Sequence, residues 1–123
     1  MTSPSSLLIV DDNAEFVSTC EHFLTDSGFR VLKAFNGTQA VDLCADDPES
    51  FSLAIVDLNM PELDGPATIG ALKQQRPRLK VIATSGAELV PYFAQLVDLG
   101  VRDFLPKPFR LDGLLDSIQF ALT

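Results

Sequence analysis

The chain has 123 residues, which is within the usual range for one domain, and 46% of them are hydrophobic. Its nine basic and seventeen acidic residues give a net charge of -8, which repels a phosphate backbone and argues against direct nucleic-acid binding. No apolar run approaches the roughly 20 residues of a membrane span, so we expect no membrane insertion. The polar start lacks a basic residue and predicts a disordered N-terminal tail over residues 1–6, followed by one domain over residues 7–123.

Five short apolar runs, each bounded by turn residues or charges, are predicted strands. They are residues 7–10, 31–34, 53–56, 81–84 and 103–105. Apolar residues recur at helical spacing after each run, most clearly after the fifth, at Leu111, Leu114, Leu115, Ile118 and Leu122. Strands that alternate with helices pair in parallel through right-handed crossovers, so we predict an α/β fold with helices on both faces of the sheet.

Glycine and proline mark several helix ends. Gly28 and Gly100 stand where C-terminal caps are expected, because glycine readily adopts a left-handed conformation. Pro66 and Pro91 suit the first turns of the third and fourth helices. A residue before proline disfavours the helical region, so we expect Val90 to be extended and the fourth helix to start late.

The cysteines and the single tyrosine are predicted to be structural. Cys20 and Cys44 fall on the apolar faces of the first two predicted helices. Free cysteine is among the most buried residue types, so we predict core thiols rather than a disulfide, in keeping with a cytoplasmic protein. Tyr92 is also expected in the core.

Polar side chains follow the predicted strands. Asp11 and Asp12 come after the first strand, Asp57 after the third, Ser85 after the fourth and Lys107 after the fifth. The carboxyl ends of parallel strands form one edge of the sheet, where ligands bind. Carboxylates this close repel by about 4 kcal/mol per pair at an effective dielectric of about 20, so a cation is expected, and oxygen ligands of this kind suit Mg²⁺. Such a site is suited to receiving a phosphoryl group.

Four motifs in order carry a family resemblance: VDD at 10–12, IVDLNMPELDG at 55–65, IATSG at 82–86 and GVRDFLPKPF at 100–109. Together they resemble the receiver domain of two-component response regulators. The resemblance covers the chain from residue 7 onward. It implies a single flavodoxin-like (βα)5 domain whose parallel strands are in the order 2-1-3-4-5.

The resemblance implies a role for each matched residue. Asp57 matches the phosphoacceptor, and Ser85 and Lys107 match the groups that contact the phosphoryl oxygens. The implied Mg²⁺ ligands are Asp12, Asp11 partly through water, Asp57 and the backbone carbonyl of Asn59. The implied phosphodonor is a phosphohistidine on a sensor histidine kinase or a histidine phosphotransfer protein. Such a domain is no enzyme, because it assists only its own phosphorylation and dephosphorylation.

Switching is implied to involve Ser85, which moves toward the phosphoryl group, and the ring of Phe104, which turns inward behind it. Tyrosine is commoner than phenylalanine at the position of Phe104 in the family. Because phenylalanine has no hydroxyl, packing alone governs the position of this ring. We expect the face of the fourth helix, fifth strand and fifth helix to rearrange and control an unknown output partner or domain. Asn59 and Ala87 match positions that tune the lifetime of the phosphoryl group, and Ala87 cannot hold an attacking water through its side chain.

Partner docking is expected beside the site, around Phe16. The docking residues that the resemblance implies are Ala14, Val17, Ser18 and Pro108. The Lys107–Pro108 peptide bond is usually cis in the family, an arrangement that aims the lysine.

Three alternative functions are considered. A flavin-binding module with the same sheet order needs a phosphate loop rich in Ser, Thr and Gly, whereas Asp11 and Asp12 would repel a ribityl phosphate. An aspartyl phosphatase needs a second Asp two positions after the first-strand nucleophile, and the adjacent Asp11 and Asp12 have the wrong spacing. A receiver-like module that works through protein contacts without phosphorylation is disfavoured by the complete set of site residues.

Overall fold

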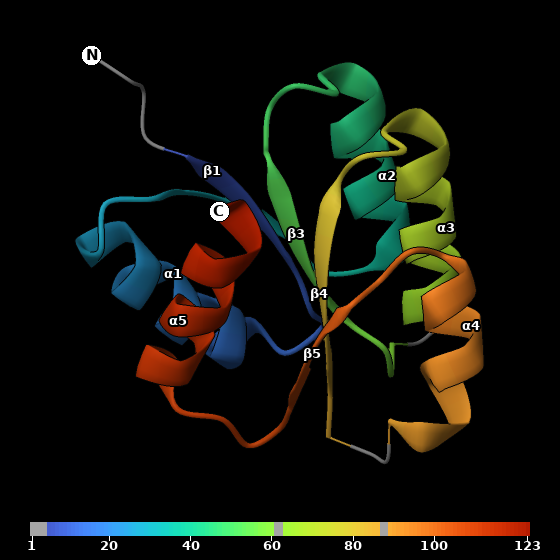
Figure 1. Cartoon of the computed structure of the whole chain (residues 1–123). Helices are drawn as coiled ribbons and strands as arrows, with labels where there is room; N and C mark the ends of the chain where they lie inside the picture. Colours follow the sequence, from blue (N-terminus) through green and yellow to red (C-terminus); the bar gives the residue numbers. More distant parts are fainter. Residues whose placement is uncertain (1–4, 61–62, 87–88) are drawn as a thin grey trace.

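A computed structural model of the chain describes residues 5–60, 63–86 and 89–123. Its core is a parallel sheet with the strand order β2-β1-β3-β4-β5. Helices α1 (Ala14–Asp26) and α5 (Leu111–Leu122) cover one face of this sheet, while α2, α3 and α4 lie on the other face (Figure 1). The predicted α/β fold and the strand order that the resemblance implies are confirmed.

Each predicted strand and helix is present. The strands are β1 (Ser6–Val10), β2 (Arg30–Ala34), β3 (Leu53–Asp57), β4 (Lys80–Ser85) and β5 (Asp103–Pro106). The remaining helices are α2 (Gly37–Asp46), α3 (Gly65–Gln75), the short 3₁₀ helix η1 (Val90–Tyr92) and α4 (Phe93–Asp98). Strand β1 begins at Ser6, which the sequence analysis places in the N-terminal tail, and residues 1–4 of that tail lie outside the described part of the chain.

Two apolar cores form because the central strands are buried on both faces. In β3, Leu53 and Ile55 belong to the core beneath α1 and α5, whereas Ala54 and Val56 belong to the core beneath α2 and α3. Successive residues of a strand point to opposite faces, so a continuous apolar run supplies both cores. Cys20 and Cys44 are buried thiols, one in each core, as predicted.

The glycines and Pro66 have the expected positions, but the predictions for Val90 and Pro91 need correction. Gly28 and Gly100 have φ values of 99° and 81°, in the left-handed region. Helix α4 begins late, at Phe93, as predicted. Val90, however, is not extended, because it begins the 3₁₀ helix η1. Pro91 is in the first turn of η1, where its missing N–H group is not needed, and this overrides the extended preference of the preceding residue.

Polar caps begin the helices that flank the site. The side chain of Asn13 accepts a hydrogen bond from the N–H of Phe16, which starts α1 directly after the Asp11–Asp12 pair. The side chain of Asp64 likewise accepts from the N–H of Ala67 and starts α3. These caps place the first turns of two helices beside the carboxyl edge of the sheet.

Candidate functional site

The three predicted acidic residues converge at the carboxyl edge of the sheet. Carboxylate oxygens of Asp11, Asp12 and Asp57 all lie within 4.8 Å of one another. The pairing of β1 with β3 causes this, because Val10 lies opposite Val56 and the aspartates follow directly. Asp11 and Asp57 are only 1% and 5% exposed, whereas Asp12 is exposed to solvent. The site is therefore a partly open pocket with two buried carboxylates at its base.

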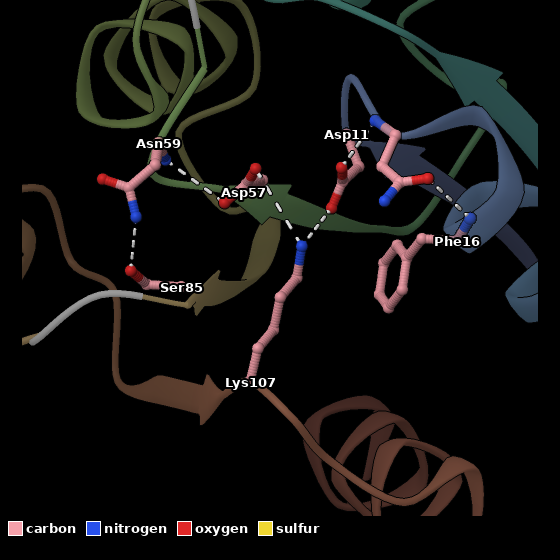
Figure 2. A network of polar contacts seen from close by, with 7 residues as sticks. Asp11, Phe16, Asp57, Asn59, Ser85 and Lys107 are labelled. Carbon is pink, nitrogen blue, oxygen red and sulfur yellow. Dashed lines mark hydrogen bonds and ion pairs between the residues drawn. The ribbon is translucent and has the colours of Figure 1, made fainter.

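The ammonium of Lys107 reaches both buried carboxylates from the loop after β5 (Figure 2). Its Nζ lies 2.6 Å from Oδ2 of Asp11 and 4.0 Å from Oδ2 of Asp57. The same atom lies 4.3 Å from the ring centroid of Phe16, a cation–π contact. The N–H of Lys107 donates to the carbonyl of Ser85 at 2.7 Å, and the Lys107–Pro108 bond is cis, as the resemblance implies.

The surroundings of Asp57 shift the pKa of its carboxyl upward. Burial raises the pKa of this carboxyl above its ordinary value of 3.8, and the negative charges of Asp11 and Asp12 add to the rise. The hydrogen bond from the N–H of Asn59 and the charge of Lys107 oppose it. The net shift of the Asp57 pKa is upward. A further positive charge beside this carboxyl, in addition to Lys107, would therefore favour its ionised form.

Asn59 links the aspartate to the predicted switch residue. Its N–H donates to Oδ1 of Asp57 at 3.2 Å, and its side-chain Nδ2 donates to Oγ of the buried Ser85 at 2.6 Å (Figure 2). The hydroxyl of Tyr92 donates to Oδ1 of the same amide at 3.2 Å. Tyr92 is only partly buried and makes this polar contact, whereas the sequence predicts a core residue. An isolated tyrosine beside apolar residues has the same sequence pattern as a core residue.

Of the other predicted switch and lifetime residues, only one can be placed. Phe104 is half-buried, and its ring centroid lies 5.2 Å from that of Phe93 at the start of α4. Packing against another ring agrees with the expectation that a residue without a hydroxyl is held by packing. Ala87 lies outside the described residues.

The predicted docking surface needs one correction. Ala14, Ser18 and Pro108 are exposed, but Val17 is 0% exposed and is not available to a partner. Val17 belongs to the core between α1 and the sheet, because the apolar face of α1 turns inward at this position. A groove of about 380 Å³ lies beside the acidic pocket, and its walls include Phe16, Gly86, Lys107, Pro108 and Phe109.

Comparison with known proteins shows the family. Residues 7–119 match the response regulator receiver domain. The transcriptional regulatory protein CpxR of Escherichia coli (strain K12) is 37% identical over 119 residues, which cover 96% of this chain and 49% of CpxR. The chemotaxis protein CheY of Bacillus subtilis (strain 168) is 32% identical over 117 residues, which cover 94% of this chain and 96% of CheY. The chain belongs to the response regulator receiver domain family.

Solved structures agree with this fold. The chemotaxis protein CheY4 of Vibrio cholerae has a TM-score of 0.88 at 24% identity, over 96% of this chain and 98% of CheY4. A response regulator protein from Burkholderia pseudomallei, solved with a phosphorylated aspartic acid, a calcium ion and citrate, has a TM-score of 0.83 at 27% identity, over 94% of this chain and 66% of the other. The chain spans about half the length of the first curated relatives it matches.

Membership of this family supports a role in two-component phosphorelay signalling, and the flavin-binding and phosphorylation-independent alternatives are not favoured. Receiver domains are signalling domains that use Mg²⁺ at an acidic pocket, and here an aspartate cluster lies at the carboxyl edge of the sheet. Within the described residues, no helix is long and apolar enough to cross a membrane.

Proposed function

We propose that Asp57 is the phosphoacceptor of a Mg²⁺-dependent phosphorelay. The observation that carries this proposal is the position of Asp57. This residue is 5% exposed, and its carboxylate lies in one cluster with those of Asp11 and Asp12, 4.0 Å from Lys107 Nζ. Phosphoryl transfer depends mainly on positioning and on neutralising charge. This pocket combines a nucleophilic carboxylate with a cationic side chain and further oxygen ligands.

The phosphodonor is a phosphohistidine on a sensor histidine kinase or a histidine phosphotransfer protein. A carboxylate oxygen of Asp57 forms the new bond to phosphorus while the phosphorus–nitrogen bond of the phosphohistidine breaks. The electron pair of the broken bond stays on the imidazole nitrogen. Lys107 and the hydroxyl of Ser85 stabilise the phosphoryl oxygens once Ser85 has turned away from Asn59.

Mg²⁺ fits the donor set, because hard cations prefer oxygen ligands and three carboxylates repel one another unless a cation is bound. Asp11, Asp12 and Asp57 would hold the ion together with the backbone carbonyl of Asn59. When bound, the ion neutralises negative charge on the carboxylates and the phosphoryl group. Two of these carboxylates are buried and Asp12 is exposed, which leaves the pocket open toward solvent for a donor.

The groove beside α1 is proposed as the docking surface for the phosphodonor. Ala14, Ser18 and Pro108 are exposed near it, and the rings of Phe16 and Phe109 pack edge to face with centroids 5.6 Å apart. An apolar surface next to the nucleophile suits a helix that presents a histidine. We place the reaction in the cytoplasm, where the buried thiols Cys20 and Cys44 stay reduced.

The output is proposed to follow from the added charge. A phosphoryl group brings a charge of roughly -1.5 to -2 to the pocket. Ser85 then moves toward it, and the ring of Phe104, which contacts Phe93 at the start of α4, turns inward behind it. The face of α4, β5 and α5 thereby controls an output partner or domain. Asn59, beside the nucleophile, and Ala87 are proposed to set how long the phosphoryl group persists.

Phosphorylation by a small donor tests this proposal without a partner. We expect the wild-type chain, incubated with acetyl phosphate and Mg²⁺, to gain the mass of one phosphoryl group, and the gain to disappear without Mg²⁺. Asp57→Asn should abolish it, whereas Asp116→Asn, at an exposed position of α5, should leave it unchanged. A wild-type chain that stays unmodified, or an Asp57→Asn variant that is still modified, would contradict the assignment.

A further inference from the structure

A chain of two hydrogen bonds leads from the proposed switch residue to the segment before α4. Asn59 Nδ2 donates to Ser85 Oγ at 2.6 Å, and the hydroxyl of Tyr92 donates to Asn59 Oδ1 at 3.2 Å. Tyr92 is the last residue of η1, and α4 begins at Phe93. The two bonds therefore connect the interior of the site with the start of a helix on the proposed output face.

The contact with Tyr92 accompanies one orientation of the side-chain amide of Asn59. A tyrosine hydroxyl that donates a hydrogen bond must meet the amide oxygen, which turns the amide nitrogen toward Ser85. The backbone N–H of Asn59 is also engaged, because it donates to Asp57 Oδ1. With three of its polar groups held, Asn59 offers Ser85 a rigid donor rather than a rotating one.

We propose that Tyr92 is a positioning residue that acts through Asn59 to hold Ser85 in its resting place. The proposal rests on the proposed function, in which Ser85 leaves this place to contact a phosphoryl group on Asp57. Holding Ser85 opposes that movement, so the hydroxyl of Tyr92 lowers the affinity of the pocket for a phosphoryl group or its mimic. Because such coupling is reciprocal, occupation of the pocket also weakens the contact between Tyr92 and Asn59.

The composition of the chain makes this coupling measurable. Tyr92 is the only tyrosine and there is no tryptophan, so tyrosine emission reports on this residue alone. The ring of Tyr92 packs against the core beneath α2 and α3, while its hydroxyl makes the polar contact. Tyr92→Phe therefore removes the hydrogen bond and keeps the ring.

The test measures the affinity of the intact chain for beryllofluoride, a mimic of the phosphoryl group, by calorimetry in the presence of Mg²⁺. We expect Tyr92→Phe to bind roughly two- to tenfold more tightly than wild type, the effect of one hydrogen bond. In an Asn59→Ala background the same substitution should have no further effect, because the effect passes through Asn59. Asp42→Asn, at an exposed position of α2 and away from the proposed output face, should bind like wild type.

Tyrosine emission of the wild-type chain provides a second readout, and we expect it to change as beryllofluoride fills the pocket. Equal affinities for wild type and Tyr92→Phe would overturn the proposal, as would an equal gain in the Asn59→Ala background or an unchanged emission. If wild type itself does not bind beryllofluoride, the proposed function fails, and this proposal fails with it. Binding by wild type without an effect at Tyr92 overturns this proposal alone.

Discussion

Lys107 is paired more closely with Asp11 than with Asp57. Its Nζ lies 2.6 Å from the Asp11 carboxylate and 4.0 Å from the Asp57 carboxylate. Asp11 is nearly inaccessible to solvent, so the ammonium supplies the opposite charge beside its buried carboxylate. The lysine thus supports the resting pocket, in addition to the proposed contact with a phosphoryl group.

Replacement of Lys107 by Met should therefore destabilise the fold. Loss of the partly buried ammonium leaves two buried carboxylates without a cation, and we expect the free energy of unfolding at neutral pH, measured by urea denaturation in EDTA, to fall by about 2–3 kcal/mol. Lys33→Met is the matched control, because Lys33 forms an ion pair with Glu21 nearer the surface, and its removal should change stability by less than about 1 kcal/mol. Equal losses in the free energy of unfolding for the two variants would show that the ion pair of Lys107 stabilises the fold no more than a surface pair does.

Stability should depend on pH through Asp57. Burial raises the pKa of Asp57 in the folded state above its ordinary value of 3.8, so the folded state binds a proton more readily than the unfolded state. The contribution of Asp57 to stability is accordingly present below pH 3.8 and is lost as pH rises through the raised pKa. At neutral pH in EDTA, Asp57→Asn should be more stable than wild type by on the order of 1–2 kcal/mol, because it removes one of three clustered charges.

The difference between wild type and Asp57→Asn should shrink as the pH is lowered through the raised pKa toward 3.8, because wild-type Asp57 then becomes neutral as well. Urea denaturation of both proteins at several pH values measures this. A difference that stays constant with pH, or that grows in acid, would contradict the direction assigned to the Asp57 pKa.

Gly65 should tolerate no side chain, because the first turn of α3 passes directly over the end of β3. A Cβ atom there would clash with the Cα of Leu58 and would lie 2.6 Å from the carbonyl oxygen of Asp57, and both are backbone atoms. We expect Gly65→Ala to lower the free energy of unfolding by about 3 kcal/mol or more and to weaken Mg²⁺ binding, since relief of the clash moves the backbone of Asp57. Calorimetric melting and Mg²⁺ titration measure the two effects.

Gly113 provides the control for Gly65. A Cβ atom at Gly113, in α5, meets no atom within 4 Å. Gly113→Ala should therefore stabilise the protein by roughly 0.5–1 kcal/mol through helix propensity and leave Mg²⁺ binding unchanged. Loss of stability in this variant would show that glycine is needed in α5 for some reason other than space.

Cys20 should be unreactive in the folded protein. Burial, helped by the negative charge of Asp11, raises the pKa of its thiol to about 11, so only about one molecule in a thousand carries the reactive thiolate at pH 8. We expect Ellman's reagent to react with the native chain more than about 100-fold more slowly than with the chain in urea. Ser18→Cys, at an exposed position of the same helix, should react rapidly in the native state. Fast labelling of native wild type would contradict the buried assignment.

The fold and the centre of the site could be predicted from local patterns. A buried parallel strand must be a continuous apolar run, and the runs of β1, β3 and β4 are followed directly by Asp11, Asp57 and Ser85. The geometry of parallel sheets then brings Asp11, Asp57 and Lys107 to one edge. No long-range detail is needed for this step, because every strand of the sheet runs in the same direction.

Other features depend on packing between segments far apart in the chain. Val17 follows the acidic motif closely enough to be predicted as a docking residue, but it lies on the buried face of α1 with Cys20 and Leu24 and packs into the core. The hydrogen bond from Tyr92 to Asn59 joins residues separated by 33 positions, and no local pattern distinguishes that tyrosine from a core residue.

The sequence by itself determined the order of elements, the two-faced burial of the central strands and the residue types at the carboxyl edge, because these follow from spacing along the chain. Only the tertiary structure decided that Lys107 pairs with Asp11, that Asn59 holds Ser85, and that Gly65 lies against Asp57. Those contacts depend on side-chain directions and on distances of a few ångströms, which arise only when the helices pack onto the sheet.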